Sequence, residues 1–208
     1  MLDSSRKLWL IAVGALLAAA VSAQEPFQLH SAAFSNGGTP PLSMILNNVS
    51  NGVNACTGSG SLGLDQSPEL FWTGAPWGTQ SYAVVLYDTT AAFTHWGMYN
   101  IKPGVHQLPQ NAGVANSTYG SEIMNDFYLG QQYDGPCPPV GFAPEIHNYV
   151  FTVYALSVML ELPSSANFPA NSETLFQALI KAGDQGQILA HASLIALYSS
   201  TPGSGHTD

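Results

Sequence analysis

The chain has 208 residues and a formal net charge of -9, because 13 acidic residues stand against only 4 lysines and arginines. This length fits one domain plus a targeting segment. The scarcity of basic side chains disfavours a nucleic-acid partner, since contacts to phosphates need them. With 20 glycines, 14 prolines and 46% hydrophobic residues, the composition describes a packed, loop-rich globular chain rather than a disordered one.

The start of the chain has the pattern of a secretory signal peptide. A short basic stretch precedes an apolar run, 8–23, which ends in the small residues Val-Ser-Ala before Gln24, a sequence typical of signal-peptidase sites. The alternative is a membrane anchor, but the run is shorter than the ~20 residues of a spanning helix. We therefore expect a signal peptide at 1–23, one mature domain at 24–208, a secreted or periplasmic location and no stable membrane anchor.

In the mature chain, short apolar runs alternate with turn-forming clusters, which favours strands over long helices. Strands are expected, in chain order, at 27–34, 82–87, 96–101, 149–156 and 188–198. The runs 82–87 and 149–156 are apolar on both faces, as is typical of central strands. Two polar stretches, 47–66 and 111–125, are expected to be surface loops, and 203–208 a frayed tail.

One helix is expected near the C-terminus. Asn171 or Ser172 can cap its start, and apolar residues recur at helical spacing between 175 and 180. Gly183 can end it, because glycine readily takes the left-handed conformation that follows many helices. The apolar stripe is expected to pack into the core.

The only cysteines are Cys56 and Cys137. In an exported chain, an even pair is typical of one disulfide, although two buried free thiols remain an alternative. Two cysteines with no nearby histidine pair cannot form a closed zinc site.

No recognisable cofactor or metal motif is present. The run Gly58–Gly63 spells G-x-G-x-x-G, but it lacks the preceding strand and following helix that a dinucleotide site needs. Neither a G-x-S-x-G hydrolase elbow nor an H-E-x-x-H metal motif occurs. We therefore expect neither a cofactor nor a metal.

Several polar side chains stand at the ends of the expected strands. Asp88 follows one strand, His95 precedes the next, and a proline-rich loop, 135–139, leads to His147 and Tyr149 at the start of another. Strand-end groups meet at the rim of a sandwich, where loops form pockets. Each histidine alone is better explained by a structural role, but the set together favours a binding site.

The following segments, in chain order, match one family: Ser67-Pro68-Glu69-Leu70-Phe71-Trp72, Gly78-Thr79-Gln80-Ser81-Tyr82-Ala83, Asp88-Thr89-Thr90-Ala91, His95-Trp96, and Gly135-Pro136-Cys137-Pro138-Pro139 followed by His147-Asn148-Tyr149-Val150-Phe151. Through them the chain resembles the phosphatidylethanolamine-binding proteins, also called Raf kinase inhibitor-like proteins, in their bacterial secreted branch. The resemblance covers 27–198. It implies a mainly β fold, an antiparallel Greek-key β-sandwich with a helix near the C-terminus, and a small anion pocket at one end.

The resemblance also implies which residues bind the ligand, a phosphate-like anion or a phospholipid headgroup. The candidate ligand-binding residues are Asp88, His95, Gly135, Pro136, Cys137, His147, Tyr149 and Tyr198. Both imidazoles can donate hydrogen bonds to a phosphoryl oxygen, and the positive charge of the site is expected to come from them, because no lysine or arginine is included. Asp88 would repel an anion unless its charge orients a histidine, which is the role we expect.

Two residues depart from the family pattern. Thr90 stands in place of an aspartate, and Asn148 in place of an arginine, so the choice of headgroup is left open. A binding module, not an enzyme, is the first expectation. The alternatives are an inhibitor or regulator of a protease or other extracellular protein and, less favoured because no nucleophile is identified, a hydrolase.

Overall fold

The computed structural model describes residues 24–165 and 167–201; the expected signal peptide and the C-terminal tail lie outside the described residues. The elements, in chain order, are β1 (Gln28–His30), a 3-10 turn (Leu42–Met44), β2 (Val49–Ser50), β3 (Val53–Asn54), β4 (Leu70–Thr73), β5 (Ser81–Asp88), β6 (Phe93–Ile101), β7 (Gln107–Leu108), β8 (Ser121–Glu122), β9 (His147–Leu156), α1 (Ser172–Asp184) and β10 (Ile188–Tyr198).

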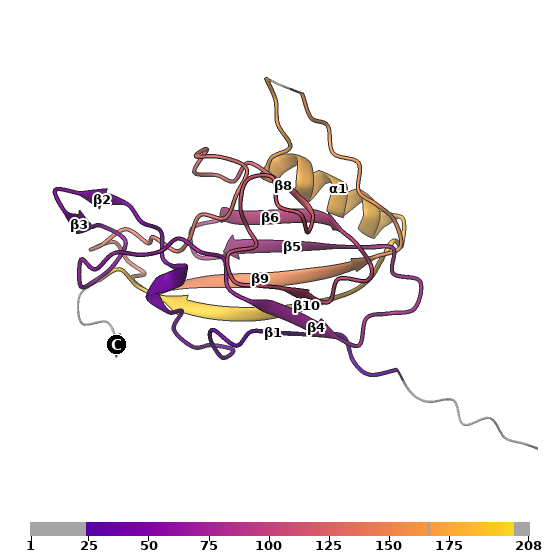
Figure 1. Ribbon diagram of the computed structural model, residues 1–208, viewed down its shortest axis with the longest axis horizontal. Coiled ribbons are helices and arrows are strands. Elements are labelled where there is room, and N and C mark those ends of the chain that lie inside the picture. The colour runs from indigo at the N-terminus through magenta and orange to yellow at the C-terminus, as the bar shows by residue number, and fades with distance from the viewer. Residues whose placement is uncertain (1–23, 166, 202–208) are drawn as a thin grey trace, which may run out of the picture.

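The strands form a large sheet in the order β10-β9-β5-β6-β8, a small sheet in the order β1-β4-β7, and a separate β2-β3 hairpin. All of these strand pairs are antiparallel. The hairpin projects from the end of the large sheet where β9 begins (Figure 1). The expectation of a mainly β chain with antiparallel sheets is confirmed, whereas the Greek-key order stays a prediction.

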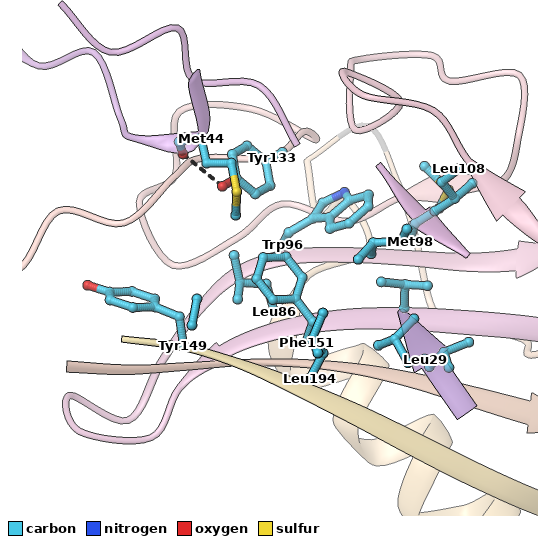
Figure 2. Packing of buried hydrophobic residues seen from close by; sticks show 14 of the residues in the cluster. Leu29, Met44, Leu86, Trp96, Met98, Leu108, Tyr133, Tyr149, Phe151 and Leu194 are labelled. Carbon is cyan, nitrogen blue, oxygen red and sulfur yellow. Dashed lines mark hydrogen bonds between the residues drawn. The ribbon is translucent and has the colours of Figure 1, made fainter. Parts of the chain in front are cut away.

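Apolar residues cover both faces of the large sheet because side chains alternate along each strand. On β5, Tyr82, Val84 and Leu86 enter one buried cluster with residues of the small sheet. Figure 2 shows part of this cluster, including a hydrogen bond of 2.8 Å from the Tyr133 hydroxyl to the Met44 carbonyl. The alternate β5 residues enter a second cluster on the opposite face, which α1 covers. The central strands are therefore buried on both sides.

The helix is held at its start by a capping box. The Asn171 side chain accepts a hydrogen bond from the Thr174 amide at 3.0 Å, and the Thr174 hydroxyl accepts one from the Asn171 amide at 2.9 Å. The helix continues past Gly183 to Asp184, and Gly186, with a φ of 66°, takes the left-handed conformation after it. The expected end at Gly183 is therefore one residue too early, because Gly183 lies within the last helical turn and a later glycine takes the left-handed position.

Several short elements differ from the expectation. The strand expected at 27–34 is limited to β1, β4 was missed, and the expected loops 47–66 and 111–125 contain the hairpin and β8, respectively. Strands of two to four residues are too short to show a clear alternation in sequence. A disulfide joins Cys56 to Cys137, which settles the choice between a bridge and free thiols. Within the described ranges, no helix is long and apolar enough to cross a membrane.

Candidate functional site

The antiparallel register brings the expected strand-end residues together. Asp88, the last residue of β5, is the register partner of Phe93 on β6 and of Tyr149 on β9. His95 lies two residues into β6 from Phe93, and His147 is the first residue of β9. Residues from three strands that are distant in sequence therefore meet at one end of the large sheet.

A cavity of about 170 Å³ opens at this end. Its lining residues are Asp88, Ala91, Phe93, His95, Phe127, Cys137, Pro138, Pro139, His147 and Tyr149. Five of the eight residues predicted to bind the ligand are thus in the lining. Among the described residues, no three histidine, cysteine, aspartate or glutamate side chains are grouped in a way that could hold a metal ion.

Asp88 orients His147. The Oδ2 atom of Asp88 lies 2.6 Å from Nδ1 of His147, and both side chains are buried. The other oxygen, Oδ1, accepts hydrogen bonds from the amides of Thr90 and Ala91 at 2.8 and 3.1 Å. Because an ionised carboxylate only accepts hydrogen bonds, Nδ1 of His147 carries a proton and Nε2 is the ring nitrogen left for a ligand. The charge of Asp88 is thus directed at a histidine and at backbone amides.

The two departures from the family pattern bind one another beside this pair. The Thr90 hydroxyl oxygen accepts hydrogen bonds from the backbone amide of Asn148 at 3.0 Å and from its side-chain amide at 3.3 Å. This contact ties the turn after β5 to the start of β9. Thr90 and Asn148 therefore have a structural use that does not involve a ligand.

His95 is held by two backbone carbonyls. Its Nδ1 lies 3.0 Å from the carbonyl oxygen of Asp134 and 3.1 Å from that of Gly135. Burial lowers the pKa of His95 to about 4, although these two carbonyls and nearby carboxylates oppose the shift. The expectation that both histidines supply positive charge is therefore wrong for His95, because its ring is neutral at physiological pH. Desolvation, which sequence does not show, outweighs the favourable contacts.

Tyr149 places a hydroxyl group in the same site. The side chain is fully buried, and its hydroxyl lies near the Asp88 carboxylate and the Cys137 amide without a hydrogen bond of good geometry to either. Burial, together with the Asp88 carboxylate, raises its pKa, so the hydroxyl keeps its proton. An unsatisfied buried hydroxyl is costly, and this one is free to donate a hydrogen bond to a bound molecule.

Three of the predicted residues lie outside the lining. The Gly135 amide, expected to face an anion, donates instead to Oδ1 of Asp65 at 2.7 Å. Pro136 accepts a hydrogen bond from the Leu46 amide through its carbonyl oxygen, and the Tyr198 hydroxyl donates to the Cys56 carbonyl at 2.7 Å. These residues fix the proline-rich loop and the disulfide in place.

Two aromatic wall residues, Phe93 and Phe127, were not predicted. Their ring centroids lie 4.7 Å apart and 5.1 and 5.2 Å, respectively, from that of His95. Phe93 stands two residues before His95, so the alternation of the strand could have identified it. Phe127 lies in an irregular segment, and no local sequence pattern indicates its position.

Comparisons with known proteins agree with this architecture. The family model described as Phosphatidylethanolamine-binding protein matches residues 31–199. YbcL of Escherichia coli, described as a new member of the mammalian PEBP family, has a solved structure that superposes with a TM-score of 0.63 at 27% identity, covering 85% of this chain and 99% of YbcL. The chain therefore belongs to the phosphatidylethanolamine-binding protein family.

Two relatives show how widely this similarity extends. A UPF0098 protein of Methanothermobacter thermautotrophicus is 35% identical over 138 residues, which is 64% of this chain and 82% of the relative. LppC of Mycobacterium tuberculosis, whose name calls it a candidate lipoprotein, is 30% identical over 160 residues, or 75% of this chain and 68% of the relative.

Proposed function

We propose that this protein is an exported binding protein that holds a phosphoryl anion or a phospholipid headgroup in the cavity at the end of the large sheet. The observation that carries the proposal is the Asp88–His147 pair, with a contact of 2.6 Å, facing the same small cavity as His95 and Tyr149. Family membership supports a ligand-binding function in general.

The available donors suit the oxygens of an oxyanion. The unpartnered Tyr149 hydroxyl can donate one hydrogen bond, and His147, when protonated, can donate another through Nε2 while Asp88 balances its charge. A cavity of about 170 Å³ holds a headgroup but not an acyl chain. The rest of a larger ligand would therefore lie outside.

The surface next to the cavity supports a ligand with an apolar part. Residues 139–146, which connect two cavity-lining positions, are all exposed. This segment includes Val140, Phe142 and Ile146, whose side chains are 48%, 68% and 54% exposed. Exposed apolar side chains grouped beside a pocket are typical of a binding surface. The same segment favours a second candidate function, the inhibition or regulation of an extracellular protein.

Export is supported by the disulfide, because such bonds persist in oxidising compartments, and by similarity to a relative named as a candidate lipoprotein. We propose a secreted or periplasmic location on these grounds. A hydrolase is not proposed, since the groups in the cavity include no activated nucleophile among the described residues.

Calorimetric titration with inorganic phosphate tests the proposal. His147→Ala should weaken binding by about tenfold or more, because it removes a donor and leaves the buried Asp88 carboxylate without its partner. Tyr149→Phe should weaken it by about three- to tenfold through the loss of one hydroxyl. His106→Ala, at an exposed position outside the cavity, is the control and should leave binding unchanged. Absence of phosphate binding, or unchanged binding by His147→Ala, would overturn the proposal.

A further inference from the structure

The cavity holds a hydrogen-bond acceptor where an anion site is expected to hold only donors. Carbonyl oxygens cannot donate, so the contacts of 3.0 and 3.1 Å from His95 Nδ1 to the carbonyls of Asp134 and Gly135 require Nδ1 to carry the proton of the neutral ring. Nε2 is then an unprotonated nitrogen on the opposite side of the ring. It makes no hydrogen bond to the described residues, and the ring lines the cavity.

We propose that Nε2 of His95 accepts a hydrogen bond from the bound molecule, so that the cavity selects a phosphoryl monoanion with a P–OH group over an anion of equal charge without one. This inference rests on the proposed function and specifies its ligand. An anion whose phosphorus carries only ester or alkyl groups besides its charged oxygens would leave Nε2 without a hydrogen bond. It would also place the lone pairs of the anion's oxygens next to the lone pair of Nε2. A buried polar atom left without a partner in this way weakens binding.

The surroundings of His95 keep Nε2 unprotonated. The charged groups near the ring are the carboxylates of Asp88 and Asp126, and they favour the imidazolium, as do the backbone carbonyls of Asp134 and Gly135. Against them act the burial of the ring, which is 2% exposed, and the aromatic rings packed around it. Asp88 is engaged with His147 and two amides, and Asp126 accepts from the Thr94 amide. Burial prevails, and the pKa of His95 is lowered to about 4.

The neighbouring groups complete the arrangement. One P–OH of the ligand donates to His95 Nε2, while an unprotonated phosphoryl oxygen accepts from the Tyr149 hydroxyl, which has no other partner among the described residues. His147 contacts Asp88 through Nδ1, so its Nε2, on the other side of the ring, is left for the ligand. The ligand therefore satisfies one acceptor and one donor that the folded chain leaves unpaired.

Two probes of equal charge and similar shape test the selection. At about pH 5, inorganic phosphate is a monoanion with P–OH groups, whereas dimethylphosphinate is a monoanion with methyl groups in their place. Calorimetry on the wild-type protein should show that phosphate binds about 10- to 100-fold more tightly. Equal or tighter binding of dimethylphosphinate would overturn the inference and leave the proposed function intact. Failure of both probes to bind would overturn the proposed function itself.

A substitution at His95 tests whether this residue causes the preference for phosphate over dimethylphosphinate. In His95→Asn, the amide nitrogen can still donate to the carbonyls of Asp134 and Gly135, but no atom replaces Nε2. The preference for phosphate should fall to within about twofold. His106→Asn, outside the cavity, should retain the wild-type preference. A full preference in folded His95→Asn would show that another group selects the ligand, and the two-probe comparison on the wild type decides the inference if that variant does not fold.

Discussion

Glu122 is a buried carboxyl on β8, and its replacement by glutamine should change how stability depends on pH. The side chain is 6% exposed; Oε2 accepts a hydrogen bond of 2.8 Å from the Trp96 indole, and Oε1 has no partner among the described residues. Burial raises the pKa of Glu122 from 4.5 to about 9, although the bond from Trp96 opposes the shift. The carboxyl is therefore protonated at neutral pH in the folded chain and ionised in the unfolded chain.

The size of the effect follows from proton linkage. Because the pKa of Glu122 is higher in the folded chain than in the unfolded chain, the contribution of this carboxyl to stability is fully present below pH 4.5. That contribution is lost as the pH rises towards about 9. Each pH unit within this interval lowers the free energy of unfolding by about 1.4 kcal/mol. From about pH 7 to pH 8.5 the loss should be about 2 kcal/mol. This window lies above the pKa of Asp65, which burial raises to about 6, and that of His95.

Denaturant unfolding at these two pH values measures the loss directly. Glu122→Gln is neutral throughout and should lose no more than about 0.5 kcal/mol, so it should also be more stable than the wild type at the higher pH. Glu161→Gln, at an exposed position, is the matched control and should keep the wild-type dependence. If the wild type and Glu122→Gln lose equal amounts of stability, the reasoning about the buried carboxyl is wrong.

Two further predictions concern the loop beside the cavity. Replacing Cys56 and Cys137 by alanine removes a bridge between residues 81 apart and should lower the free energy of unfolding, measured by denaturation, by about 4 kcal/mol. The same change should weaken phosphate binding, measured by calorimetry. Alkylation of both cysteines in unreduced secreted protein would contradict the bridge. Gly135→Ala places a Cβ 2.0 Å from a backbone carbonyl oxygen and should destabilise the fold by about 1–3 kcal/mol or more. Gly104→Ala, where a Cβ meets nothing within 4 Å, is its control, and equal melting temperatures for the two variants would refute the packing argument.

Much of the site could be predicted because its residues stand next to strong local signals. Asp88 is the last residue of β5 and His147 is the first residue of β9, and antiparallel pairing then brings them together. The cysteine pair was also accessible from sequence, since an even number in an exported chain favours a bridge. In contrast, Phe127 lies in an irregular segment, and only the packing of that segment on His95 places it in the wall.

The sequence by itself determined the mainly β character, a helix cap at Asn171 or Ser172 and the set of polar residues at the strand ends, because alternation, capping and turn formation depend on near neighbours. Only the tertiary structure decided the protonation of His95 and the direction in which these polar groups point. His95 is neutral because distant segments bury it, and its tautomer is set by two carbonyls about 40 residues away in the chain. The Gly135 amide likewise points to Asp65, a residue 70 positions away in the chain. Desolvation and hydrogen bonding between remote residues are properties of the folded chain, and here they leave His95 neutral where the sequence led us to expect a cation.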